Sequence, residues 1–382
     1  MDWIANAPII LWCCIVFILG LMVGSFLNVL IARLPHEKSI IWPSTSRCFA
    51  CFQAIRLTDN LPIIGYLRLR GKCRYCKAPF SSRYLWVEIG TGLGFLALFA
   101  FEILLNWHKI PAFTYHNVVT QHALPPWQCC VFFAYHAFLL CGLIAAAVID
   151  AEHRIIPPLI PYAGMVVGVV GGALLPWPWP NPVAIAGVMP TNSTWIFHEF
   201  LGRIPLGLQP WPFWGPTPPF TPPGSIRMGL TTAMLGALAG SLVVRLIKWL
   251  FEVGFGREAM GLGDADLLMM AGAFLGWQIA VLSLFVGAVS ALVLKLLGML
   301  LGTSSTNPAL DPRGEGTREL PFGPGLAIGV VVTWFSWHWL GPRVQFVFFD
   351  TITIGISALV MCIGMVAAGL LLRRPDETQA PQ

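Results

Sequence analysis

The chain has 382 residues, of which 56% are hydrophobic and only 11% are charged. A soluble globular domain carries roughly 25% charged residues, so this composition excludes a water-soluble globular protein. The formal net charge is +5. We interpret this charge as a consequence of membrane topology, and no nucleic-acid partner is expected.

Apolar runs long enough to cross the ~30 Å hydrocarbon core of a bilayer recur along the chain. They predict an all-α polytopic membrane protein with about eight to nine transmembrane helices, at residues 9–31, 86–105, 131–150, 158–176, 229–251, 264–278, 280–301, 322–341 and 350–372. The sixth run is short, and with the seventh it could form one bent element around Gly276. The first run is too long for a cleaved signal peptide and has no basic residue before it, so we expect it to remain as a span.

The distribution of lysine and arginine predicts the orientation of these spans. Ten of these residues lie in the loop 32–85, whereas the next loop, 106–130, holds one. Short loops rich in positive charge stay on the cytoplasmic side, so the loop 32–85 is expected there and the N-terminus outside. The external loop 177–228 is crowded with proline and tryptophan, which favours a non-helical segment on the outer membrane surface over a partner-docking segment.

The basic loop also contains four cysteines in the pattern C-x2-C-x21-C-x2-C: Cys48, Cys51, Cys73 and Cys76. Each C-x2-C turn can present two thiolates to one ion, so the pattern predicts a structural Zn²⁺ site with tetrahedral geometry. The alternative of two disulfides is disfavoured by a reducing compartment. A closed four-thiolate site has no open position for water, so the metal is expected to organise the loop and not to hydrolyse a substrate.

Two aspartates stand at predicted span ends on the cytoplasmic side. Asp150 ends the third run and Asp264 opens the sixth, after Gly261 and Gly263. Carboxylates near a bilayer are costly, and two that share one proton can activate water and polarise a peptide carbonyl. This arrangement indicates peptide-bond hydrolysis, with the two glycines allowing an unusual turn and close approach of substrate backbone. The alternative is solvated loop aspartates with glycines that serve helix packing.

Three further polar residues lie near these positions. Glu152 would face roughly the opposite side of a continuing helix from Asp150, so Asp150 is the favoured acid. Glu88 lies where a salt bridge to a loop arginine would explain it as well as catalysis would. His153 is interpreted as a solvated residue at the membrane interface.

Together these residues resemble the type IV prepilin peptidase family, which are GxGD membrane aspartyl proteases. The resemblance covers most of residues 20–340 and rests on segments that occur in order: Gly24–Ile31, Arg33-Leu34-Pro35, Ser46–Cys51, Asp59–Pro62, Leu69–Cys76, Ser82-Arg83-Tyr84, Val87-Glu88, Asp150 with Ile156-Pro157, Gly261–Asp264, Gly272–Trp277 and Pro321–Pro324. Asp266 departs from the pattern, because the family usually has a lysine there. This change either puts an anion beside Asp264 or leaves a solvated side chain.

The resemblance implies an enzyme of the bacterial inner (cytoplasmic) membrane that cuts leader peptides from type IV prepilins or type II secretion pseudopilins at the cytoplasmic face. Asp150 and Asp264 correspond to the catalytic pair, and the four cysteines correspond to the family's tetracysteine motif. Methylation of the new N-terminus with S-adenosylmethionine is implied to follow. A competing hypothesis is a non-catalytic scaffold or transporter in which the zinc module docks a cytoplasmic partner.

These interpretations divide the chain into six expected parts: a first span (1–31), the tetracysteine domain (32–85), spans that carry Asp150 (86–176), the external loop (177–228), spans that carry Asp264 (229–341), and an additional span with a tail (342–382).

Overall fold

The computed structural model describes residues 3–39, 46–107, 127–174, 220, 225–255, 261–300, 322–349 and 351–372. Nearly all of these residues are helical, and the only extended pairing among them is two isolated β-bridges. The long helices of this part of the chain are α1 (Trp3–Arg33), α3 (Arg83–Phe99), α5 (Trp127–His153), α6 (Leu159–Leu174), α9 (Ile226–Phe255), α10 (Leu262–Leu275), α11 (Trp277–Leu300), α12 (Phe322–Phe349) and α13 (Thr351–Leu372). The predicted all-α class is confirmed.

The helices match the predicted spans in order. Five segments are long and apolar enough to cross a membrane: Ala7–His36, Arg83–Leu104, Cys129–His153, Ile226–Gly254 and Trp277–Leu300. Shorter apolar helices follow at Leu159–Leu174, Phe322–Trp337 and Gly355–Gly364. Because at least five segments have the length and hydropathy of spans, the protein is a multi-pass membrane protein.

The expected bend at Gly276 is present. This residue alone separates α10 from α11, with φ 85° and ψ 170°. That conformation is open to glycine and strained for residues that carry a Cβ atom. The sixth and seventh runs are therefore two helices joined at a sharp corner.

Helix α10 lies at the centre of the bundle, and every residue from Asp264 to Leu275 is buried. Its closest neighbour is α9, and the two backbones meet at small residues. A Cβ atom added to Gly236 of α9 would lie 2.7 Å from the carbonyl carbon of Gly272 in α10. Small residues allow such close contact between membrane helices. This packing fixes the position of Asp264 at the beginning of α10.

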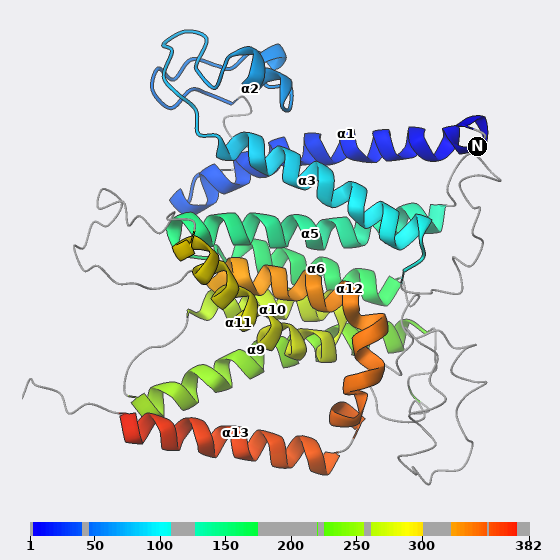
Figure 1. Ribbon diagram of the computed structural model, residues 1–382, viewed down its shortest axis with the longest axis vertical. Coiled ribbons are helices and arrows are strands. Elements are labelled where there is room, and N and C mark those ends of the chain that lie inside the picture. Colours follow the sequence, from blue (N-terminus) through cyan, green and yellow to red (C-terminus); the bar gives the residue numbers. More distant parts are fainter. Residues whose placement is uncertain are drawn as a thin grey trace, which may run out of the picture.

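The helices run side by side, and the cysteine-bearing segment with the short helix α2 (Ile64–Arg68) lies outside the packed bundle, next to the end of α1 and the beginning of α3 (Figure 1). Most of the expected external loop 177–228 lies outside the described residues, and so does the terminal tail after residue 372.

Candidate active site and metal centre

Asp150 lies in the last turn of α5 and Asp264 in the first turn of α10. Each is only 8% exposed. The carboxyl groups are close enough for the charge of Asp150 to act on Asp264. Two neighbouring carboxylates with little access to water repel each other unless they share a proton. The structure therefore brings together the two aspartates predicted from the sequence, one from the end of α5 and the other from the beginning of α10.

A third contact holds Asp150 in place. The backbone N–H of Gly323, at the beginning of α12, donates a hydrogen bond of 2.8 Å to Oδ2 of Asp150. A Cβ atom at Gly323 would lie 2.7 Å from Asp150 Oδ2 and 2.9 Å from Asp150 Cβ. Gly323 belongs to the segment Pro321–Pro324 that resembles the family, but the sequence indicates no role for it. Its contact crosses 173 positions of the chain, and only its place between two prolines marked it out.

The two glycines before Asp264 differ from expectation. Gly261 has extended backbone (φ −70°, ψ 150°), and Gly263 belongs to the first turn of α10. The prediction of an unusual turn at these glycines is therefore wrong. Gly263 instead allows close packing, because a Cβ atom there would lie 2.9 Å from the Cβ of Ile156. This contact places the beginning of α10 against the chain that leaves α5.

Asp266 is neither solvated nor unpaired. Its Oδ1 lies 3.0 Å from Nη2 of Arg245 in α9. The side chain of Asp266 is 12% exposed and that of Arg245 is 45% exposed. The anion that replaces the usual lysine of the family pattern thus has a cation beside it. Arg245 was not singled out from the sequence, because the two residues meet only when α9 packs on α10.

The residues near the end of α5 connect it to neighbouring segments. Glu152 forms a salt bridge with Arg83 at the beginning of α3, which supports the choice of Asp150 over Glu152 as the functional acid. The ring of His153 lies 5.5 Å from that of His36. Glu88 accepts a hydrogen bond of 2.8 Å from the backbone N–H of Ile63, and no arginine pairs with it among the described residues.

The four cysteines of the basic loop meet at one point. All four Sγ atoms lie within 4.8 Å of one another, with Cys48 and Cys76 at 3.7 Å and Cys51 and Cys73 at 3.9 Å. Tetrahedral coordination with Zn–S bonds of about 2.3 Å separates the sulfur atoms by roughly 3.8 Å. All four are free thiols, which is contrary to the disulfide alternative. The residues present therefore fit a metal ion held by four thiolates.

The two C-x2-C turns have the same local structure. In each, the backbone N–H of the residue after the second cysteine donates to the carbonyl of the first, at 2.9 Å for Phe52 and Cys48 and at 3.1 Å for Lys77 and Cys73. One antiparallel bridge closes each turn, Arg47 with Ala54 and Lys72 with Pro79. Two equivalent turns that face each other are the arrangement that a four-thiolate metal site requires.

The electrostatics of this module favour a thiolate at Cys73 and hold the second turn in place. Backbone hydrogen bonds from Cys76 and Tyr75 lower the pKa of Cys73 to about 6, and the thiolate is the form that binds metal. Burial and the three neighbouring cysteines raise the pKa of Cys76 to about 11. Arg74 donates two hydrogen bonds to the carboxylate of Asp59, and this guanidinium lowers the pKa of Asp59. This ion pair links the second cysteine turn to the segment before α2.

Two protein-family models match the chain. Residues 18–101 match the bacterial peptidase A24 N-terminal domain, which spans the end of α1, the tetracysteine module and α3. Residues 223–296 match the type IV leader peptidase family and include Asp264. Asp150 lies between the two matched segments, so its place beside Asp264 comes from the structure.

Several relatives carry the name prepilin leader peptidase/N-methyltransferase. The protein of Myxococcus xanthus is 30% identical over 318 residues, which are 83% of this chain and 70% of the relative. The chain belongs to the prepilin leader peptidase/N-methyltransferase family. The relative from Stutzerimonas stutzeri is 29% identical over 87% of this chain and 94% of its own length, and that from Pseudomonas aeruginosa is 28% identical over 89% and 94%. No solved structure matches the chain significantly.

Proposed function

We propose that this protein is an aspartyl endopeptidase that removes the leader peptides of type IV prepilins or type II secretion pseudopilins and then methylates the new N-terminal residue. The main support is the juxtaposition of Asp150 and Asp264 at neighbouring helix ends in a member of the prepilin leader peptidase/N-methyltransferase family. The names of the relatives supply both activities.

The aspartate pair can perform hydrolysis by sharing one proton. The ionised carboxyl takes a proton from water while the protonated one donates to the carbonyl oxygen of the scissile bond. The N–H of Gly323 stabilises negative charge on Asp150, and Gly263 lets the beginning of α10 approach Ile156. Each contact fixes one of the two carboxyl groups relative to the other.

The proposed function also includes a structural metal ion, a methyl donor and a cytoplasmic location for the aspartates. The four cysteines would hold a Zn²⁺ ion that fixes the fold of the basic loop, and S-adenosylmethionine would supply the methyl group. The excess of positive charge in the loop 32–85 supports a location in the bacterial inner membrane with the aspartates at the cytoplasmic face. The substrate would then reach the site as a basic leader segment continuous with an apolar helix in the lipid bilayer.

The test is co-expression with a prepilin or pseudopilin precursor, followed by mass spectrometry of the product. Asp150→Asn and Asp264→Asn should each abolish leader removal, because neither asparagine can share the proton that activates water. Glu152→Gln is the matched control, since it neutralises an acid two residues from Asp150 that pairs with Arg83. Continued processing by both aspartate variants would refute the assignment of the pair.

A further inference from the structure

A cavity lies away from the aspartate pair, between the cysteine module and the ends of two helices. Its volume is about 360 Å³, within the range of roughly 300–1,000 Å³ that is typical of small-molecule sites. The end of α1, the first cysteine turn, the segment around α2 and the beginning of α3 all contribute to its wall. The proposed protease chemistry does not use it.

The wall contains buried acceptor groups whose hydrogen bonding is incomplete. Asn28 is 3% exposed and donates its amide N–H to the carbonyl oxygen of Tyr84 at 2.9 Å. Its Oδ1 is buried and has no hydrogen-bond partner among the described residues. Leaving a buried acceptor unpaired is costly, so a ligand N–H or O–H group that reaches it would be favoured. Glu88, 8% exposed, adds a carboxylate that Ile63 fixes in place.

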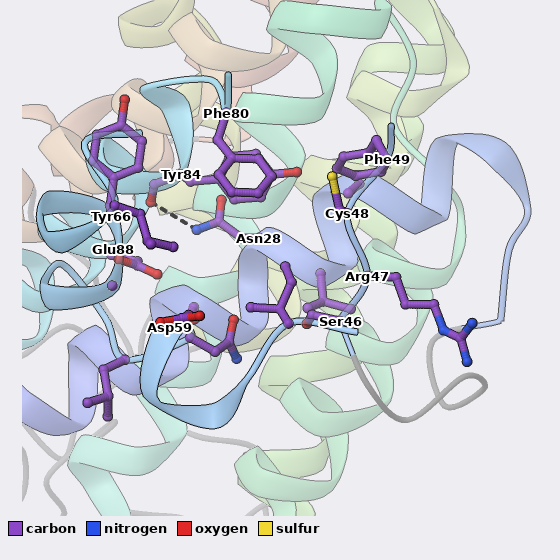
Figure 2. Close-up of a pocket in the computed structure, with 18 of the residues that line it drawn as sticks. Asn28, Ser46, Arg47, Cys48, Phe49, Asp59, Tyr66, Phe80, Tyr84 and Glu88 are labelled. Carbon is purple, nitrogen blue, oxygen red and sulfur yellow. Dashed lines mark hydrogen bonds between the residues drawn. The ribbon is translucent and has the colours of Figure 1, made fainter. Parts of the chain in front are cut away.

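The other walls offer aromatic faces and positive charge. Figure 2 shows Tyr66, Phe80, Tyr84 and Phe49 gathered along one side of the cavity, with Glu88 and Arg47 far apart at its two ends. Aromatic faces attract purine rings by stacking and attract cations through their π-electrons. A ligand that uses all these groups has an aromatic base, hydroxyl or ammonium donors, a cationic centre and a carboxylate.

We propose that this cavity is the binding site for S-adenosylmethionine. In this assignment, which rests on the proposed function, the aromatic side receives the adenine and the sulfonium. Asn28 and Glu88 accept hydrogen bonds from amine or hydroxyl groups, and Arg47 with Lys38 binds the carboxylate. When bound, this molecule supplies a methyl carbon that the amine of the cleaved peptide attacks with its lone pair. The carbon–sulfur bond breaks with its electron pair going to sulfur, leaving S-adenosylhomocysteine, and the methylated ammonium releases one proton to water.

The charge of the cavity disfavours the other possible occupant, the basic leader of a precursor. Its charged lining residues are Arg33, Lys38, Arg47, Asp59 and Glu88. Asp59 already pairs with Arg74, so among the described lining residues Lys38 and Arg47 outnumber the one remaining acid, Glu88. A leader with several lysines and arginines would be repelled. S-adenosylmethionine has a net charge of only +1, and its carboxylate finds basic partners in this lining.

Two side-chain contacts link the segments around the cavity to the end of the bundle that carries the aspartate pair. Tyr84 of the cavity follows Arg83, which forms the salt bridge with Glu152. His36, just after the end of α1, contacts His153. Because Glu152 and His153 directly follow the turn of Asp150, the two sites share one end of the bundle. A cleaved peptide held at the membrane surface would move between them without crossing the bilayer.

The test measures binding directly, with the purified full-length protein in detergent and S-adenosylmethionine in equilibrium dialysis. Glu88→Gln keeps an acceptor for the Ile63 N–H but removes the charge, and it should weaken binding about tenfold or more. Asn28→Leu should also weaken binding. Glu37→Gln, an exposed acid outside the cavity, is the control and should bind as the unaltered protein does. Photo-cross-linking with methyl-labelled S-adenosylmethionine should label peptides that contain Phe49, Tyr66 or Phe80.

The outcomes separate this inference from the proposed function. Binding that neither variant weakens, or cross-links outside the cavity, would overturn the site while leaving the methyltransferase intact. Failure of the unaltered protein to bind S-adenosylmethionine and to methylate a cleaved precursor would remove the proposed methyl transfer itself. Displacement of S-adenosylmethionine by a synthetic basic leader peptide, lost on Glu88→Gln, would assign the cavity to the leader and refute the inference. Thermal unfolding of each variant shows whether a loss of binding reflects a loss of fold.

Discussion

Gly323 brings its backbone N–H to Asp150 at a distance that no larger residue can keep without displacing that carboxyl. We expect Gly323→Ala to lower kcat for leader removal by at least tenfold with little change in KM, because the added Cβ would lie 2.7 Å from Asp150 Oδ2. The measurement is cleavage kinetics with a purified precursor. Gly355→Ala is the matched control, since a Cβ atom there meets nothing within 4 Å. Equal kcat values for Gly323→Ala and the control would show that this contact does not position Asp150.

The ion pair between Asp266 and Arg245 predicts a reciprocal effect of charge reversal. Asp266→Lys alone restores the usual residue of the family pattern but places a second cation beside Arg245, so the variant should unfold at a lower temperature. The double variant Asp266→Lys with Arg245→Asp should recover most of the loss. The coupling free energy is expected to be about 1 kcal/mol or less, because Arg245 is 45% exposed. Additive losses in the double-mutant cycle would mean that the two residues do not interact.

At this scale the sequence identifies residue types but not the contacts between them. Asp150 and Asp264 could be selected because carboxylates at span ends are rare and costly. The roles of Gly323 and Arg245 could not be selected in this way, because the sequence does not show which group a backbone N–H contacts or which acid an arginine inside a long helix meets. Both become visible only when α12 and α9 are placed against α5 and α10.

The cysteine module is the element whose stability depends on the proposed metal. The purified protein should contain about one zinc ion, and Cys48→Ser or Cys73→Ser should lose it, because three remaining thiolates cannot complete the tetrahedral site. Metal analysis by mass spectrometry tests this. Cys14→Ser is the control, since that exposed thiol in α1 lies outside the group of four. Purification of the unaltered protein without metal, and with all four thiols open to alkylation, would contradict the zinc assignment.

The elements themselves were largely predictable from the sequence. Long apolar runs gave the helices in their correct order, and the glycine at residue 276 marked the corner between α10 and α11 because its positive φ is open to few other residues. Local propensity did not reveal the conformation around Gly261 and Gly263. Gly261 is extended and Gly263 is helical, and neither conformation requires glycine. Position 263 holds glycine because Ile156 packs too closely for a Cβ atom.

For the whole molecule, the asymmetry of basic residues and the order of the helices together predict a single topology. Ten lysines and arginines lie in the loop 32–85, whereas the loop 106–130 holds only Lys109. If all nine long helices cross the membrane and the N-terminus is outside, we expect the cysteine module and the ends of α5 and α10 that carry the aspartates on the cytoplasmic side, and we expect the C-terminus there too.

Reporter fusions test this arrangement. Alkaline phosphatase, which is active only outside the cytoplasm, should be active when it is inserted in the loop 106–130 and inactive when it is fused within residues 32–85. Green fluorescent protein at the C-terminus should fluoresce, because it folds on the cytoplasmic side. A truncation before Thr351 that carries the same fluorescent fusion is the control, since removal of α13 moves the fusion point outside and should abolish fluorescence. Active phosphatase within 32–85 would place the metal module and the aspartate pair on the wrong side for a cytoplasmic leader peptide, because the two lie at the same end of the bundle.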